Sequence, residues 1–223
     1  MASPLTIQPS GKDNFLDGNS VTTNYGTEIN LDLMSYTHYN MRPILSFDAS
    51  GYIGGSANIT SAKLYLYMGY IYSGNPTGLQ VNCCKITRND WTELYSTWNR
   101  YKSGTNWTTA GGDYVTTNPA MGTYTPINND LGWWEWNIKD IVVDSIDNVN
   151  SIVNLLIRFN TENTGMCRLY LASKEYPTTA LRPKLVIVYT ETDIKSVNGL
   201  VIASVKSKNG LAIADIKSFN GIE

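Results

Sequence analysis

The chain has 223 residues and 42% of them are hydrophobic, so it can form one large domain with a short appendage. Only 16% of the residues are charged, the formal net charge is −2 and no basic run occurs, which excludes the electrostatic character of a nucleic-acid groove. No segment approaches the ~20 consecutive apolar residues that a membrane-spanning helix needs.

The first residues, Met1 to Thr6, contain neither the basic region nor the apolar run of a secretory signal. We therefore expect the protein to fold in a reducing cytosol. The cysteines agree with this expectation, because Cys83 and Cys84 are neighbours on an expected strand and Cys167 stands alone. Adjacent residues of a strand point to opposite faces, so the sequence predicts buried thiols rather than a disulfide framework.

Oxygen-bearing side chains gather in the N-terminal region, at Asp13, Asp17, Asn19 and Asn24. Carboxylate and amide oxygens are the ligands of Ca²⁺ sites, so these residues are candidates for a structural calcium site. Asp and Asn also form Asx turns without any metal, and we favour that interpretation. Apart from such a calcium ion, we expect no cofactor.

Strand patterns follow one another along the first 190 residues, and they are separated by clusters of Gly, Asn, Pro and Ser. Lys63, Tyr65 and Tyr67 alternate with apolar residues, which is typical of a strand with one buried face. One helical turn is expected at residues 138–146. The sequence thus predicts an all-β jelly-roll β-sandwich over residues 1–190. Its expected strands are residues 5–8, 27–34, 43–48, 59–72, 79–87, 134–138, 151–160, 168–173 and 184–190.

The stretch of residues 91–132 is rich in Trp, Tyr, Asn, Gly and Thr and has weak periodicity, so we expect one large ordered loop. Trp107 lies among Thr and Asn residues and is the best candidate for contact with a partner or a glycan, and Trp98 and Tyr114 are further candidates. For the tryptophans as a group, a place in the core or in an interface is favoured over sugar contact. Trp134 and Trp136 are two residues apart on an expected strand and share one face, which favours a place in the core.

Catalytic constellations are scarce. His38 is the only histidine, so a histidine-based triad or a multi-histidine zinc site cannot be built, and we expect a surface-loop residue there. The carboxylates of the Trp-rich stretch, Asp90, Glu93 and Asp113, sit beside Thr and Asn as turn formers do. We therefore expect that the protein is not an enzyme.

Residues 191–223 carry a repeat with a spacing of eleven residues. The unit Ile194 to Ala203 recurs as Val205 to Ala214 and begins again at Ile216. Each unit places an Asn-Gly pair between short aliphatic runs, and Asn-Gly favours the two-residue turn of a β-hairpin. The sequence therefore predicts a short C-terminal appendage of β-hairpin repeats.

So short a repeat cannot bury a core of its own. We interpret residues 191–223 as a docking or oligomerisation segment of a homo-oligomer, with a trimer preferred, because identical chains can satisfy one another's strand edges around a rotation axis. A flexible tail is the alternative. The apolar residues assigned to docking are Ile194, Leu200, Ile202, Val205, Leu211, Ile213 and Ile216.

Several short motifs of residues 1–190 follow one another in a distinctive order. They are Asp13, Asn24 to Thr27, Arg42 with Leu45 to Asp48, Ile59 to Leu64, Trp91 to Glu93 with Thr97 and Trp98, and Arg182 to Leu185 with Val188 and Tyr189. This series resembles the DNRLRE domain over residues 13–190. The resemblance implies a jelly roll of the carbohydrate-binding type, often with a structural calcium, that serves as a non-catalytic module of extracellular or surface proteins.

The C-terminal repeat resembles segments of bacteriophage virion proteins. Together the two resemblances predict a non-enzymatic structural protein of a phage head or tail, assembled in the host cytoplasm and located in the virion. Its expected partners are other virion proteins and a host-surface glycan. The alternative is a carbohydrate-binding module of a secreted or cell-surface bacterial protein.

Overall fold

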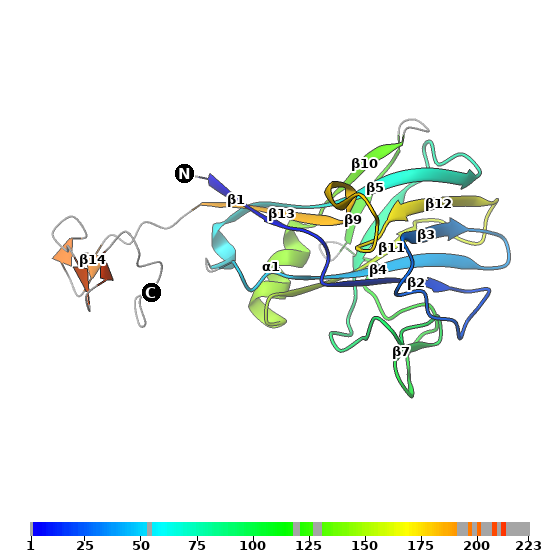
Figure 1. Ribbon diagram of the computed structural model, residues 1–223, viewed down its shortest axis with the longest axis horizontal. Helices are drawn as coiled ribbons and strands as arrows, with labels where there is room; N and C mark the ends of the chain where they lie inside the picture. Colours follow the sequence, from blue (N-terminus) through cyan, green and yellow to red (C-terminus); the bar gives the residue numbers. More distant parts are fainter. Residues whose placement is uncertain are drawn as a thin grey trace.

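The computed structural model describes residues 2–52, 55–117, 121–126 and 131–190, together with the backbone of four two-residue strands nearer the C-terminus (Figure 1). No helix in these ranges is long and apolar enough to cross a membrane. The strands and helices are β1 (Ala2–Ile7), β2 (Lys12–Asp17), β3 (Asn30–Ser35), β4 (Asn40–Asp48), η1 (Ser56–Asn58), β5 (Ile59–Ser73), β6 (Val81–Lys85), β7 (Arg100–Lys102), β8 (Thr105–Asn106), β9 (Met121–Tyr124), β10 (Gly132–Asn137), α1 (Lys139–Asn148), β11 (Ile152–Phe159), β12 (Cys167–Ala172), η2 (Thr179–Leu181), β13 (Lys184–Thr190), β14 (Ser196–Val197), β15 (Leu200–Val201), β16 (Ser207–Lys208) and β17 (Leu211–Ala212).

The main sheet is antiparallel and curls on itself, with the strand order β1-β13-β5-β12-β3-β4-β11-β6-β9. β10 pairs with β5 and β2 pairs with β4 off this path. The inner faces of the curled sheet enclose one core, in which Leu64 and Leu66 of β5 pack with Leu155 and Ile157 of β11. This arrangement confirms the predicted all-β, jelly-roll-like sandwich.

Residues 91–117 of the Trp-rich stretch form a cover over the outer face of β2, β4 and β11. The stretch is not the single loop that we expected, because β9 pairs with β6 in the main sheet. Leu16, Ile44 and Leu156 point outward from these strands, and they form a second core with Trp91 and Trp107 of the cover. In Figure 1 the part of the cover that carries β7 lies below β2 and β4, whereas β5 and β10 form the upper edge of the sandwich. The described part of the cover therefore lies on the outer face of β2, β4 and β11, and it leaves the outer face of β5, β10 and β12 exposed.

Each of the nine expected strands is present, and their ends agree with the structure to within three residues. The expected helical turn is the start of α1. The sequence did not predict β2, because its buried Asp13 and Asn14 lack the apolar alternation of a strand. Their side chains are instead satisfied by hydrogen bonds, such as those from Asn14 Nδ2 to Ser96 O at 2.8 Å and to Ser96 Oγ at 2.7 Å.

The cysteines are free and buried, as predicted. Cys83 belongs to the main core, while burial raises the pKa of Cys84 to about 11 despite the nearby Arg158 and Arg42. Burial likewise raises the pKa of Cys167 to about 11. These thiols are therefore packing residues rather than reactive groups.

The first two C-terminal repeats form antiparallel hairpins. Val197 pairs with Leu200 and Lys208 pairs with Leu211, so two residues separate the strands at each Asn-Gly. This register is the one that a two-residue hairpin requires. The side chains assigned to docking all lie outside the described part of the structure; they are Ile194, Leu200, Ile202, Val205, Leu211, Ile213 and Ile216.

Candidate functional site

The outward face of β5, β10 and β12 carries a row of aromatic side chains, which we call the aromatic strip. Alternation along β5 produces it, because Leu64, Leu66 and Met68 point into the core and the residues between them point outward. A β-bulge opposite Tyr170 adds a residue to β5 and keeps the later tyrosines on the same outer face. The aromatic strip consists of Tyr65, Tyr67, Tyr70 and Tyr72 of β5, Trp133 of β10 and Tyr170 of β12.

Cross-strand contacts hold the rings of the aromatic strip in place. The ring centroids of Tyr67 and Trp133, which are direct partners in the ladder, are 5.6 Å apart. Tyr170 lies 5.8 Å from each of Tyr70 and Tyr72. These last two rings are nevertheless 56% and 53% exposed, so their faces are available to a ligand.

Charged groups lie among the rings. Lys184 Nζ is 4.1 Å from the ring centroid of Trp133, and the guanidinium carbon of Arg168 is 5.0 Å from that of Tyr72. Arg168 also forms an ion pair with Asp32, so its head is fixed. Rings with apolar faces and polar neighbours can stack on the apolar face of a sugar while hydrogen-bonding its hydroxyls.

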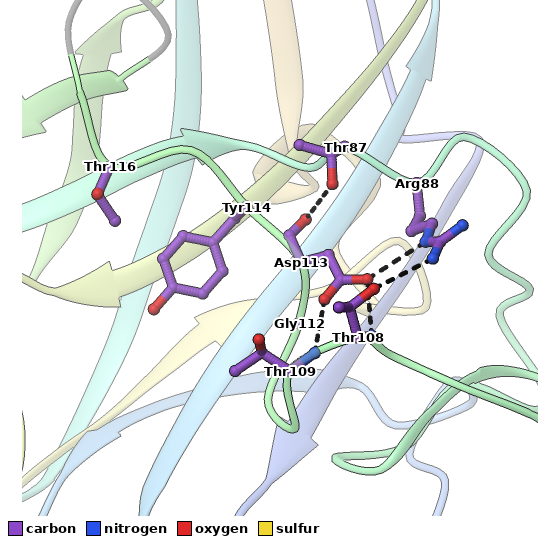
Figure 2. A pocket seen from close by; sticks show the side chains of 8 residues that line it. All are labelled: Thr87, Arg88, Thr108, Thr109, Gly112, Asp113, Tyr114 and Thr116. Atoms are coloured by element: carbon purple, nitrogen blue, oxygen red, sulfur yellow. Dashed lines mark hydrogen bonds and ion pairs between the residues drawn. The ribbon is translucent and has the colours of Figure 1, made fainter.

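An open pocket of about 540 Å³ lies on the cover (Figure 2). It forms where residues 113–115 run beside the end of β6, with Thr87 N donating to Asp113 O at 2.9 Å and Val115 N to Lys85 O at 2.9 Å. Its lining residues are Thr87, Arg88, Thr108, Thr109, Gly112, Asp113, Tyr114 and Thr116.

Asp113 is the centre of the hydrogen bonding in this pocket. Its carboxylate accepts hydrogen bonds from the amides of Thr108 at 2.9 Å and Thr109 at 2.8 Å, and from Arg88 Nε at 3.2 Å. Partial burial raises the pKa of Asp113, but these hydrogen bonds outweigh that effect and hold the pKa below its usual value. The carboxylate is therefore charged at neutral pH and balanced by Arg88.

The structure separates the sequence candidates for a contact site. Tyr114 lines the pocket, and Trp98 is half-buried beside Arg42, whose guanidinium carbon is 4.8 Å from the indole centroid. The expectation that Trp107 contacts a partner or a glycan is wrong. Its side chain is only 5% exposed, and its indole N–H donates to Thr97 O at 2.9 Å. It belongs to the second core. Its Thr and Asn neighbours indicated an exposed loop, but the loop folds over its side chain.

Two of the calcium candidates form the Asx turns that we favoured over a metal site. Asp17 Oδ1 accepts from Asn19 N at 2.8 Å and Asn24 Oδ1 from Gly26 N at 3.1 Å, which are Asx turns. Asp13 Oδ2 accepts from Ser10 Oγ at 2.7 Å. No group of three or more His, Cys, Asp or Glu side chains in the described ranges is placed to hold a metal ion.

The remaining carboxylates of the cover have structural partners. Asp90 pairs with Lys102 at 2.5 Å, and Glu93 Oε1 accepts from Asp13 N at 2.7 Å. His38 is exposed, as predicted, and its ring packs edge-on against Tyr36.

The aromatic strip was not predicted from the sequence. The signal was present in the period-two tyrosines of residues 65–72, which were interpreted only as a strand pattern. That these rings stay exposed depends on which element covers which outer face, and no local pattern encodes that choice.

The model of carbohydrate-binding module family 96 matches residues 5–189, which extend from the middle of β1 to the penultimate residue of β13. The chain belongs to carbohydrate-binding module family 96. A search of curated proteins finds no match. Membership of family 96 supports the carbohydrate-binding character that the sequence resemblance implied, and modules of this type are non-catalytic. The match ends before the C-terminal repeat.

Proposed function

We propose that this family 96 module binds a polysaccharide chain along the aromatic strip. The observation that carries the proposal is the row of six aromatic side chains on the outward face of β5, β10 and β12. From Tyr65 to Tyr72 the row follows roughly 20 Å of strand, at ~3.3 Å per residue. This length exceeds one sugar ring, so the aromatic strip suits a chain of several sugars.

Stacking on several rings explains why a polymer is the expected ligand. A single aromatic contact contributes only about 0.5–1.5 kcal/mol, so one sugar on one ring binds weakly. A chain that lies across several rings gains each contact while it loses its translational freedom only once. The fixed rings and the fixed head of Arg168 further reduce the entropy lost on binding.

The test removes the two most exposed rings of the strip. We expect Tyr70→Ala with Tyr72→Ala to weaken retention in affinity gels containing soluble polysaccharides by about tenfold, because two stacking contacts are lost. The matched control is Tyr95→Ala, since Tyr95 is 58% exposed and lies on the cover rather than on the strip. Equal retention of the double variant and the unmodified protein, on every polysaccharide that binds, would refute the proposed site.

We further propose that the C-terminal repeat attaches the module to a phage particle, as a structural virion protein. Support comes from the sequence resemblance of the repeat and from the two hairpins, which have strand edges that a partner sheet can extend. The two roles are compatible, because a module held on a particle could bind a glycan of the host surface. Attachment to a secreted or cell-surface bacterial protein would use the same hairpins.

A further inference from the structure

We propose that the pocket around Asp113 is a second sugar site, which takes one uncharged sugar residue at a chain end or branch. The inference rests on the proposed carbohydrate binding, but it concerns a different surface. The cover packs on the outward residues Leu16, Ile44 and Leu156, whereas the aromatic strip is the outward face of β5, β10 and β12. The main core lies between the two sites.

The shape of the pocket suits a single small ligand. Its volume of about 540 Å³ lies within the range of roughly 300–1,000 Å³ that encloses small molecules in proteins. The aromatic strip extends along β5, whereas this open pocket is confined between Thr87 and Arg88 on one side and lining residues of the segment 108–116 on the other. A pocket confined to two short segments has room for one sugar residue rather than for a row of them.

The chemistry of the lining matches sugar hydroxyls. Four threonines and Tyr114 present hydroxyl groups, each of which can donate one hydrogen bond and accept two. The Asp113 carboxylate accepts hydrogen bonds from Arg88 and from the amides of Thr108 and Thr109, and the Thr108 hydroxyl also interacts with it, so the carboxylate orders these lining groups. The Arg88 guanidinium has five N–H groups, and its hydrogen bonds to Asp113 and Thr108 come from Nε and Nη2, so it can also donate to a sugar hydroxyl.

The charge of the pocket indicates an uncharged ligand. Arg88 Nε bonds Asp113 and its Nη2 bonds Thr108 Oγ1 at 3.2 Å, so the one cation and the one anion of the lining neutralise each other. Figure 2 shows this pair beside Tyr114, with the threonines around them. A charged sugar would gain little binding energy in this pocket, because the charges of Arg88 and Asp113 already neutralise each other.

Hydrogen bonds and close packing hold the turn that precedes Asp113 in place. Gly111 N donates to Trp98 O at 2.7 Å, and Arg42 Nη1 donates to Gly111 O at 2.7 Å. A Cβ atom at Gly112 would lie 2.7 Å from Leu156 Cδ1, so the turn is pressed against β11. Fixed hydrogen-bonding groups lose little entropy when a ligand binds, which favours specific recognition of a small molecule.

The experiment titrates the ¹⁵N-labelled full chain with methyl glycosides of glucose, galactose, mannose, xylose, fucose and N-acetylglucosamine, and follows amide NMR signals. We expect at least one glycoside to shift the amides of Thr108, Thr109 and Asp113. Arg88→Met should weaken its binding by about tenfold or more, because a charge-assisted hydrogen bond is lost. Arg100→Met is the matched control on the same cover, since Arg100 is exposed and does not line the pocket.

Two further measurements make the result specific. Thr109→Val keeps the amide that binds Asp113 and removes only the hydroxyl, so it should weaken binding with an unchanged fold even if Arg88→Met disturbs the loop. Raising the salt from about 0.05 to about 0.5 M should leave the affinity nearly unchanged, because the ligand is uncharged.

The two sites can fail separately. The proposed pocket is overturned if no glycoside shifts the pocket amides, or if Arg88→Met and Thr109→Val both bind as the unmodified protein does. The Tyr70→Ala, Tyr72→Ala variant should retain glycoside binding in the pocket. Loss of glycoside binding in that variant would show that the sugar occupies the aromatic strip instead.

Discussion

Asp13 shows how one buried carboxyl can set the pH dependence of the whole fold. It is 1% exposed, and its Oδ2 accepts hydrogen bonds from Ser10 Oγ and from Lys174 N at 2.9 Å. Burial raises its pKa most, these hydrogen bonds lower it, and the nearby Glu175 and Glu93 raise it again, to about 7 in total. The folded state therefore binds a proton on Asp13 more tightly than the unfolded state does.

This shift predicts a loss of stability on the alkaline side. The contribution of Asp13 is fully present below its unfolded pKa of about 4 and is lost as the pH rises through about 7. Urea unfolding at pH 4, 6 and 8 should show a decline in the free energy of unfolding that Asp13→Asn removes.

The control for this prediction is Asp48→Asn. Hydrogen bonds from Ser50 to the exposed Asp48 lower its pKa, so that group stabilises the fold above its unfolded pKa and acts in the opposite direction. The decline between pH 4 and 8 should therefore persist in this variant. A decline that is equally steep in Asp13→Asn would mean that other groups cause it.

The residue scale also shows what the sequence can and cannot predict. Trp134 and Trp136 were placed in the core correctly, because strand parity determines which way a side chain points. Trp107 was misplaced, because an irregular loop has no parity and polar neighbours do not determine burial. The Asx turns of Asp17 and Asn24 were predictable, since they depend on residues only two positions away.

The cover depends on its tightest turn. Gly111 has a φ of +87°, and a Cβ atom there would lie 2.5 Å from Arg42 Nη1 and 2.7 Å from Trp98 Cζ2. We expect Gly111→Ala to lower the free energy of unfolding by about 1–3 kcal/mol more than Gly104→Ala, because of this overpacking.

Gly104 is the matched control for this turn. Its φ is +70°, so alanine meets a similar backbone cost, but nothing lies within 4 Å of the added Cβ atom. Denaturant unfolding of both variants measures the difference. Equal losses of stability would mean that the backbone conformation, rather than the contact with Arg42 and Trp98, determines the cost.

At the scale of elements, local patterns predicted most of the sandwich and little of the cover. The strands with apolar alternation or long β-branched runs were found, and residues 184–190 match β13 at both ends. The cover packs on β4 and β11 through contacts between residues that are far apart in sequence. One of them is the hydrogen bond from Trp91 Nε1 to Asn154 Oδ1 at 2.8 Å. The pocket and the exposure of the aromatic strip both depend on where the cover packs, so neither could be predicted from the sequence.

The whole molecule combines the sandwich with the hairpin repeat, and we predict that the two behave independently. Deletion of residues 193–223 should leave the thermal unfolding of the sandwich unchanged and abolish incorporation into the oligomer or particle, because the two parts have separate apolar patterns. Light scattering of the unmodified protein should give a trimer, since three chains can share their strand edges.

A quadruple variant tests whether the apolar residues of the docking segment, rather than its length, cause oligomerisation. Replacement of Leu200, Ile202, Leu211 and Ile213 by Ser should yield monomers with an intact sandwich. An unmodified protein that is monomeric at high concentration, with residues 193–223 protected from protease, would instead mean that the repeat packs on its own domain.

The pairing of β1 with β13 determines how the module carries a mechanical load. Ala2 lies opposite Thr190 and Ile7 opposite Leu185, so both ends of the sandwich leave from the same end of one antiparallel ladder. A force that pulls residues 2 and 190 apart acts across this ladder and breaks its hydrogen bonds one pair after another. A force between residue 190 and a polymer held on β5 acts along β13, and the hydrogen bonds of residues 184–189 to β5 then share the load. With a polymer bound in the proposed way, we expect the module to resist tension between that polymer and the segment after β13 better than tension between its own two ends.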